Sequence, residues 1–215
     1  MKKIFAMGMA AALSLSLLAG CSSGTATVPS EAPAGNENVT TSTAPAGDAS
    51  FTTVEEGKLI MATNAQFPPY EMVADGEGYE GTGFEGIDVE LAYAIAEKMG
   101  LELVIDDMDF DSALVAVQNG AADVVLAGLS YNEERDAVMD FTDSYATGVQ
   151  VVITKEGSDV TLDNLGEKLI GTQRGTTGYI YASDTPENGG YGEDHVKAYD
   201  SGATAVQALL NDQID

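Results

Sequence analysis

The stretch 123–144, DVVLAGLSYNEERDAVMDFTDS, contains a buried strand and, a few residues later, the start of a helix. Its apolar run 124–127 is rich in β-branched residues, which favours a strand inside a sheet. Asn132 and the two acids after it are typical of a helix start, because asparagine can cap the first turn and acids complement the helix dipole. Arg135 follows in that turn, where the dipole disfavours a cation. Two explanations remain for Arg135: a surface ion pair with a neighbouring acid, or a guanidinium that binds a carboxylate.

Strands and helices alternate on the N-terminal side of this stretch. The elements predicted there are a strand at 58–63, a helix capped by Asp88 and stopped by Gly100, a strand at 101–105 and a helix at 112–118. This alternation predicts a mostly parallel sheet flanked by helices. Ligands of such sheets collect beyond the carboxyl ends of the strands. Asn64, Phe110 and the stretch 128–130 follow the predicted strands, so we expect them to share one site.

Two loops in this half of the chain carry further expectations. Two consecutive prolines make 64–70 a rigid loop, in which we expect Phe67 to be exposed to a cleft and Tyr70 to pack underneath. The glycine-rich segment 75–86 contains two matches to G-x-G-x-x-G. Neither match follows a convincing strand, and the acids within them would repel a pyrophosphate. We therefore predict a hairpin turn there, and no dinucleotide site.

A second unit is predicted after an extended run at 149–154. Its elements are a strand at 169–173, a helix near 179–182, a strand at 196–199 and a helix that Ser201 caps. The turn 174–178, RGTTG, offers amides and hydroxyls that suit an anion at a helix N-terminus, and an ordinary strand-to-helix loop explains it equally well.

The two units contain an internal repeat. Asp111 and Ser112 precede an Ala-Val-Gln triplet by the same spacing as Asp200 and Ser201 do. The first copy leads to the strand at 124, whereas the second is followed by the end of the sequence at Asp215. We therefore expect two related lobes, 51–148 for the first and 149–215 for a hinge strand and part of the second, in a chain that is truncated at its C-terminus.

The first fifty residues have the composition of an export signal and a tether. Residues 1–20 carry two lysines followed by an apolar run, which is typical of a secretory signal peptide. The sequence Leu18-Ala19-Gly20-Cys21 resembles the bacterial lipobox, so we expect Cys21 to be lipidated. The exported protein is then expected to be anchored to the outer face of the bacterial cell membrane, or to be periplasmic. Residues 21–50 are rich in Ser, Thr, Gly, Ala and Pro, and predict a disordered tether.

Charge and composition exclude several classes of function. The net charge of −26 argues against nucleic acid as a partner, because nucleic-acid binding needs basic patches. Cys21 is the only cysteine, so an intrachain disulfide is impossible. The acids at 107–111 imitate the start of a calcium loop, but the glycine and the final glutamate of that loop are missing. We expect a monomer without metal or cofactor.

Four segments together resemble the bacterial extracellular solute-binding proteins of family 3, the substrate-binding lipoproteins of amino-acid ABC transporters. These segments are ATNAQFPPYEM (62–72), GFEGIDVELAYAIAEKMG (83–100), MDFDSALVAVQNGAADVVLAGLSYNEERDAVMDFTDSY (108–145) and GTQRGTTGYIYA (171–182). They occur in the family's order and cover most of the chain from Leu59 onward. The resemblance implies a periplasmic-binding-protein-like α/β fold with two hinged lobes, the second incomplete, and with 149–153 as a crossing strand. It also implies that the protein captures a free amino acid and presents it to a permease.

The resemblance also assigns roles to individual residues. Arg135 would hold the α-carboxylate together with the turn at Thr176 and Thr177, while the Gly128 carbonyl and the Ser130 hydroxyl would receive the α-ammonium. The residues expected near the ligand side chain are Asn64, Phe67, Phe110 and Gln173. Many family members have Asp at the position of Asn64, so the uncharged Asn64 favours a neutral polar amino acid. The lobe-two aspartate that completes the family's ammonium site is expected beyond Asp215.

Two other functions share the implied fold. A dehydratase of the cyclohexadienyl or prephenate type is one, although the only histidine, His195, stands in an acidic, glycine-rich turn and no nucleophile motif is present. A ligand-sensing module of a receptor is the other, and the lipobox argues against it. The sequence predicts a binding protein and no enzyme, and it leaves the amino acid and the permease unidentified.

Overall fold

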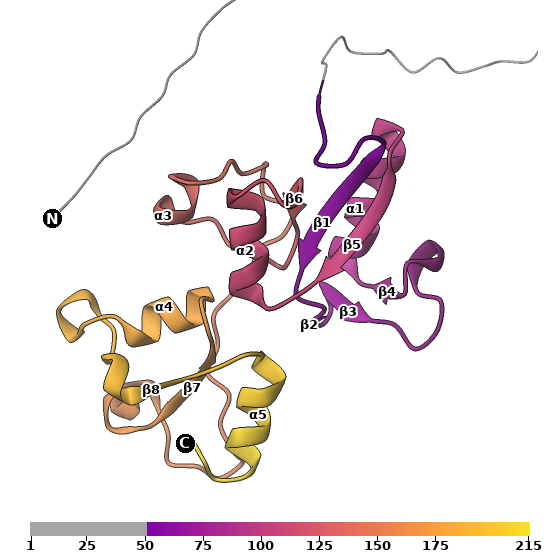
Figure 1. Ribbon diagram of the computed structural model, residues 1–215. Helices are drawn as coiled ribbons and strands as arrows, with labels where there is room; N and C mark the ends of the chain where they lie inside the picture. Colours follow the sequence, from indigo (N-terminus) through magenta and orange to yellow (C-terminus); the bar gives the residue numbers. More distant parts are fainter. Residues whose placement is uncertain (1–50) are drawn as a thin grey trace, which may run out of the picture. The chain divides into compact units, whose positions relative to one another are not determined.

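Three parallel strands form the first sheet of the protein, whose computed structural model describes residues 51–215 (Figure 1). Strand β1 (Lys58–Thr63) lies between β5 (Glu102–Asp107) and β6 (Val124–Val125). β1 pairs with β5 along its whole length, from Lys58 opposite Glu102 to Thr63 opposite Asp107. β6 pairs only through its two valines, which lie opposite Met61 and Ala62. The parallel order confirms the prediction drawn from the alternation of strands and helices.

Two helices cover the two faces of this sheet. Because successive side chains of a strand point to opposite faces, neighbouring residues of β1 pack against different helices. Met61 packs with Ala92 of α1 (Ile87–Met99) and with Leu126. Ala62 packs with Ala113 of α2 (Phe110–Gln118) and with Ala122. α1 ends at Gly100, in the left-handed conformation at φ 73°, as the sequence predicts.

The start of α1 differs from the prediction. Asp88 does not cap the helix: Gly86 precedes the first helical residue, and no side chain caps that end. Instead, Asp88 is fully buried and accepts hydrogen bonds from the Gly128 amide at 2.7 Å and from the Tyr145 hydroxyl at 2.8 Å. A buried carboxylate needs such donors more than a helix end near solvent needs a cap, so the tertiary partners determine its position.

A small antiparallel sheet is formed by the chain between β1 and α1. It consists of β2 (Gln66–Phe67), β3 (Glu71–Val73) and β4 (Phe84–Glu85). β3 and β4 form a hairpin around the glycine-rich segment, with Met72 opposite Glu85, which confirms the predicted hairpin. A Cβ at Gly86 would lie 2.2 Å from the carbonyl oxygen of Tyr70. Only glycine therefore fits where the hairpin meets α1.

The second α/β region contains the parallel strands β7 (Ile170–Gln173) and β8 (Val196–Tyr199), paired from Ile170 opposite Val196 to Gln173 opposite Tyr199. Helix α4 (Thr177–Ser183) follows β7 and helix α5 (Gly202–Leu210) follows β8. As predicted, Ser201 caps α5, and its hydroxyl accepts a hydrogen bond from the Thr204 amide at 3.2 Å. Within residues 51–215 the remaining helical segments are α3 (Glu133–Asp136) and four 3₁₀ turns, Tyr79–Gly81, Leu162–Glu167, Pro186–Asn188 and Glu193–His195.

The predicted crossing strand at 149–153 is wrong for the described residues. No strand occurs between β6 and β7, and the apolar side chains there are exposed, Val149 to 80% and Ile153 to 62%. A strand exists only when a neighbour completes its hydrogen bonds, and none of residues 51–215 pairs with this segment. The run of β-branched residues predicts an extended backbone, but it does not predict a pairing partner, and without one the segment is not a strand.

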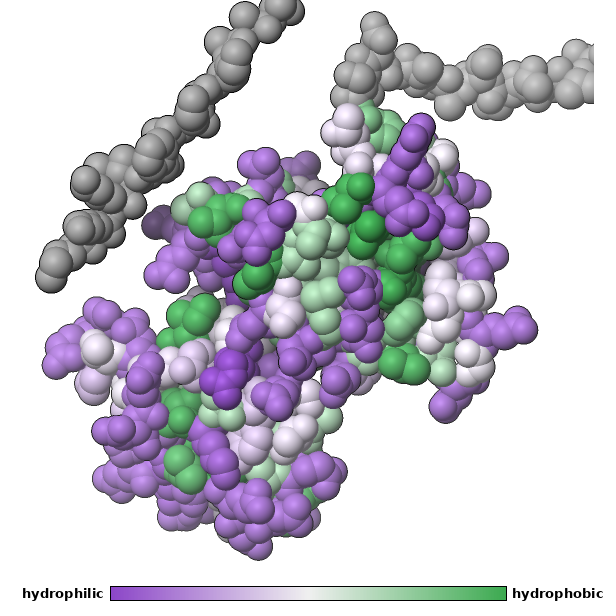
Figure 2. Space-filling view, viewed as in Figure 1, coloured by the Kyte–Doolittle hydropathy of each residue, from purple (hydrophilic) through white to green (hydrophobic). Residues whose placement is uncertain are grey.

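All residues that the structure describes belong to one compact unit, so the lobe boundary predicted between 148 and 149 stays a prediction. Below, lobe 1 denotes the described residues before that boundary and lobe 2 those after it. Figure 2 shows hydrophobic side chains gathered around β1 and β5, while the surface around β8 is largely hydrophilic. None of the helices in residues 51–215 has the length and apolar character needed to span a bilayer. The predicted signal peptide, Cys21 and the tether lie outside the described residues.

Candidate ligand-binding pocket

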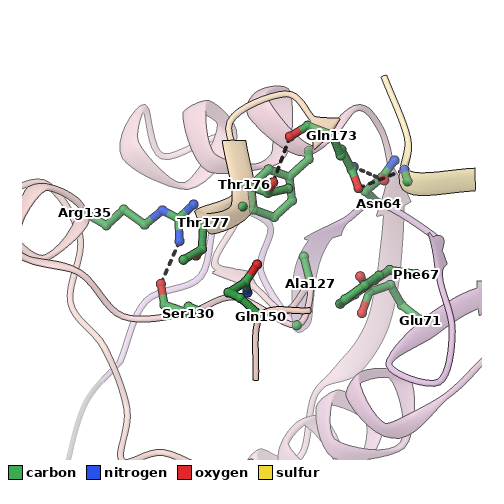
Figure 3. Close-up of a pocket in the computed structure, with 14 residues that line it drawn as sticks. Asn64, Phe67, Glu71, Ala127, Ser130, Arg135, Gln150, Gln173, Thr176 and Thr177 are labelled. Carbon is green, nitrogen blue, oxygen red and sulfur yellow. Dashed lines mark hydrogen bonds between the residues drawn. The ribbon is translucent and has the colours of Figure 1, made fainter. Parts of the chain in front are cut away.

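A pocket with a volume of about 210 Å³ lies where the carboxyl ends of β1, β6 and β7 meet (Figure 3). It contains every ligand-binding residue predicted from the sequence, together with five others. Its lining consists of Asn64, Phe67, Glu71, Phe110, Ala127, Gly128, Ser130, Arg135, Gln150, Gln173, Thr176, Thr177, Gly178 and Gly202. Drug-sized ligands occupy pockets of roughly 300–1,000 Å³. This smaller pocket therefore suits a single small metabolite.

Arg135 has a fixed position at one end of the pocket. Its amide donates to the Asn132 side chain at 2.8 Å, so the predicted cap of α3 is confirmed. The side chain is only 7% exposed, and its guanidinium donates from Nη1 to the Ser130 carbonyl at 2.7 Å and from Nη2 to the Gly175 carbonyl at 2.9 Å. The same group lies 5.7 Å from the centre of the Phe110 ring, within cation–π distance.

These contacts decide between the two explanations left open for Arg135. Among the described residues, the ion pairs involve lysines and none involves Arg135, so the surface ion pair is wrong. Burial lowers the pKa of Arg135 and the neighbouring carboxylate of Asp111 opposes that shift, but a guanidinium stays protonated in proteins. Two of its five N–H donors are used by carbonyls, and the others are available to an anion. A buried cation with donors to spare suits a carboxylate.

Gly128 joins β6 to the floor of the pocket. Its φ of +53° is one that side chains other than glycine rarely adopt, and a Cβ there would lie 2.6 Å from the Phe67 ring. Phe67 stacks on Tyr70, with 5.4 Å between ring centres, and keeps 43% of its surface exposed. This agrees with the expectation that Phe67 is open to a cleft. The carbonyl role predicted for Gly128 stays a prediction.

A chain of amide groups connects the two lobes at the floor of the pocket. Asn64 is buried and donates to the Met108 carbonyl at 2.8 Å, while its Oδ1 accepts a hydrogen bond from Gln173 Nε2 at 3.0 Å. The side-chain oxygen of Gln173, Oε1, in turn accepts a hydrogen bond from the Gly202 amide at 3.3 Å. These bonds fix which way both amides point. A polar ligand side chain would meet two oriented amides there.

The turn before α4 forms the opposite wall. Thr176 caps α4, since its hydroxyl accepts from the Tyr179 amide at 3.4 Å and donates to the Gln173 carbonyl at 2.8 Å. Its hydroxyl is therefore engaged inside its own loop. Thr177, the next residue, also lines the pocket and lies between Thr176 and Arg135 in Figure 3. The ligand contact predicted for the pair stays a prediction.

Glu71 is the pocket residue that sequence reasoning missed and that matters most. It lies on β3, is only 1% exposed, and its Oε2 has no hydrogen-bond partner. Burial, the charge of Asp88 and a hydrogen bond to Asp88 raise the pKa of Glu71 to about 10. Burial and Asp88 also raise the pKa of Tyr145. At neutral pH Glu71 is therefore an uncharged carboxylic acid within the pocket.

The sequence around the other four pocket residues contains little or no pattern that indicates a binding site. Ala127, Gln150, Gly178 and Gly202 line the pocket through their position in the fold. Glu71 stands in the quoted segment 62–72, and a signal was present there: a lone acid at a strand position between aromatic and apolar residues. No group of three or more His, Cys, Asp or Glu side chains in residues 51–215 is arranged to hold a metal ion.

Comparisons with known proteins agree with this geometry. The family model of the bacterial extracellular solute-binding proteins, family 3, matches residues 59–215. The arginine-binding extracellular protein ArtP of Bacillus subtilis (strain 168) is 35% identical over 160 residues, which are 74% of this chain and 59% of that protein. The chain thus spans about 60% of the length of this relative.

Solved structures have the same fold. An ancestral arginine-binding protein bound to arginine matches with a TM-score of 0.64 and 34% identity, over 74% of this chain and 68% of that one. An ancestral amino-acid-binding protein, described as a precursor of cyclohexadienyl dehydratase, matches with a TM-score of 0.62 and 25% identity over the same shares. The periplasmic-binding-protein-like α/β fold expected from the sequence is confirmed. Family match, identity and fold agree, and the chain belongs to the bacterial extracellular solute-binding proteins of family 3.

Proposed function

We propose that this protein is the substrate-binding component of an amino-acid ABC transporter, and that it captures one free amino acid in the pocket of Figure 3. The observation that carries this proposal is the buried guanidinium of Arg135, which binds a carbonyl of each lobe and has donors left for a carboxylate. Charge-assisted hydrogen bonds of this kind contribute about 1.5–3 kcal/mol each. The α-carboxylate of an amino acid is the group that such a site fits.

The same contacts explain how binding would be reported to a permease. A ligand that touches both lobes stabilises the closed arrangement by the difference between its affinities for the closed and open forms. Arg135 and the amide pair Asn64–Gln173 already bridge the lobes in this structure. A ligand held by the same groups would add to that bridge. The permease would then recognise the closed form.

The side chain of the ligand would lie away from Arg135, near Asn64, Phe67 and Glu71. Asn64 alone favours a neutral polar side chain, whereas Glu71 adds a group that can take a negative charge. The relative from Bacillus subtilis is named for arginine, which carries both amide-like N–H donors and a charge. Arginine is therefore the first ligand to test, with the neutral polar amino acids beside it.

The proposal places the protein outside the cytoplasm, as a monomer tethered through lipid on Cys21. The family description is extracellular, and the leader with its lipobox supports both export and anchoring. A dehydratase is not proposed, because the relative and the solved structures reported above are named as binding proteins. The ionisable groups of the pocket are those of a site that binds a zwitterion.

A thermal-unfolding screen of the standard amino acids tests this function. A ligand that binds only the folded protein raises its melting temperature, so one or a few amino acids should do so. Arg135→Ala should abolish that rise. The matched control is Arg174→Ala, which removes the other arginine of the chain, exposed in the turn after β7. If no amino acid raises the melting temperature of the parent protein, or if Arg135→Ala responds as Arg174→Ala does, the proposal is wrong.

A further inference from the structure

Glu71 and Arg135 lie at opposite ends of the pocket (Figure 3). If Arg135 holds the α-carboxylate, the side chain of a bound amino acid points toward Phe67 and Glu71. The inference below therefore rests on the proposed function and concerns what Glu71 adds to it. Glu71 is almost completely buried, and its Oε2 has no protein partner. It is a polar group that the fold alone does not satisfy.

The neighbours of Glu71 determine where a proton is held. Asp88, on α1, accepts hydrogen bonds from the Gly128 amide and the Tyr145 hydroxyl, whereas Oε2 of Glu71 has no partner. Two adjacent buried carboxylates cannot both carry charge at low cost, and the one with fewer donors takes the proton. The other titratable groups near this pair are the hydroxyls of Tyr70 and Tyr145. The cation of the pocket, Arg135, is bound to carbonyls at the far end.

A neutral carboxylic acid in this place treats charged and uncharged ligands differently. An uncharged polar side chain meets the carbonyl oxygen of the neutral acid, whose hydroxyl is directed at Asp88, and nothing needs to ionise. A guanidinium or ammonium group would meet a neutral partner in a buried site, which is unfavourable. Loss of the proton from Glu71 to solvent converts that contact into an ion pair with charge-assisted hydrogen bonds. The ligand brings one positive charge, the acid releases one proton, and the net charge of the site is unchanged.

We propose that Glu71 detects the charge of the ligand side chain by exchanging a proton: it is protonated when the pocket is empty or holds an uncharged side chain, and ionised against a cationic one. Binding of a cationic amino acid is then coupled to the release of one proton, and binding of an uncharged amino acid is not. In the ligand-free protein the pKa of Glu71 is raised to about 10, so Glu71 holds its proton at physiological pH. Binding of a cationic side chain at that pH therefore releases nearly one full proton. By linkage, affinity for the cation rises up to about tenfold per pH unit in that range.

Arginine and citrulline provide the test, because citrulline replaces the guanidinium by an uncharged ureido group of the same shape. Titration calorimetry of the purified protein with each ligand, at pH 6 to 8 in two buffers of different ionisation enthalpy, counts the protons released. Arginine should release close to one proton and bind more tightly as pH rises. Citrulline should release none and bind with an affinity that does not change. The α-ammonium and α-carboxylate are common to both ligands, so their ionisation cancels from the comparison.

Two variants complete the experiment. Glu71→Gln should abolish the proton release and remove the pH dependence of arginine binding. Glu85→Gln, which changes an exposed acid on the neighbouring strand β4, should leave both unchanged. The inference is overturned if arginine binds to the parent protein without releasing a proton, if citrulline releases as many, or if Glu71→Gln still releases one. Binding of neither ligand nor any other amino acid would overturn the proposed function itself.

Discussion

Replacement of Gly175 by alanine should separate the contact between the lobes from the stability of the fold. Gly175 has φ +70°, and a Cβ built on it would lie 1.8 Å from Oδ1 of Asp111 in lobe 1. Its carbonyl also accepts the hydrogen bond from Arg135 Nη2 at 2.9 Å. Alanine therefore has two effects: it strains its own backbone, and its methyl group collides with the Asp111 carboxylate, so that this carboxylate or the turn must move.

The two effects contribute to different measurements. The left-handed backbone costs alanine about 1–2 kcal/mol, whether the lobes are together or apart, so it lowers stability without lowering affinity. In the proposed clamp, loss of the bond from the charged Arg135 would affect only the closed form and would cost about 1.5–3 kcal/mol. Since 1.4 kcal/mol is a factor of ten, Gly175→Ala should weaken ligand binding by roughly 10- to 100-fold.

The control is Gly157→Ala, because Gly157 has a similar φ of +78° with open space around it. This variant should lose the same stability and keep full affinity in titration calorimetry. Asp111→Ala added to Gly175→Ala should recover part of the affinity, since it removes the side chain that the new methyl group meets. If Gly175→Ala folds and binds within twofold of the parent protein, the contact between Arg135 and Gly175 is not part of the bound form, and the account of closure is wrong.

Three further predictions concern stability. The native state holds a proton on Glu71 between its ordinary pKa of 4.5 and about 10, while the unfolded chain does not, so this group destabilises the fold increasingly as pH rises through that range. Glu71→Gln should therefore raise the free energy of unfolding by up to about 3 kcal/mol at pH 7 and by more at pH 8; a difference independent of pH in denaturant titrations would contradict this. Tyr145→Phe should cost about 1.5–3 kcal/mol through the lost bond to Asp88, and an unchanged denaturation midpoint would exclude that role. Ser201→Ala should cost about 1 kcal/mol as a lost helix cap, and Thr185→Ala, at a helix start without a side-chain cap, should cost clearly less in the same assay.

Local patterns predicted the sheet, its helices and much of the pocket. The capped start of α3 requires only Asn132 and its next three residues, so the sequence shows it directly. The parallel sheet follows from the alternation of strands and helices, and its carboxyl ends bring Asn64, Phe110 and Gly128 together. The ligand-binding roles of these residues remain predictions. Their presence in one pocket is what the fold adds.

The errors occur where long-range contacts determine the outcome. The partners of Asp88 are 40 and 57 residues away, so the local pattern indicated a helix cap and gave no sign of a buried carboxylate. The role of Glu71 depends on the register of β3 in a short hairpin and on the same Asp88. The segment 149–153 has the residues of a strand but no pairing partner among the described residues. In all three cases the sequence shows the side chain or the backbone segment, but local patterns do not predict which distant residue it pairs with.

A crystal structure of the protein grown with arginine tests the central claim most directly. We predict one arginine in the pocket, with its α-carboxylate within hydrogen-bonding distance of the Arg135 guanidinium and its side chain directed toward Phe67 and Glu71. An arginine bound in the reverse direction, or a ligand seated outside this pocket while Arg135 still holds only the carbonyls of Ser130 and Gly175, would contradict it.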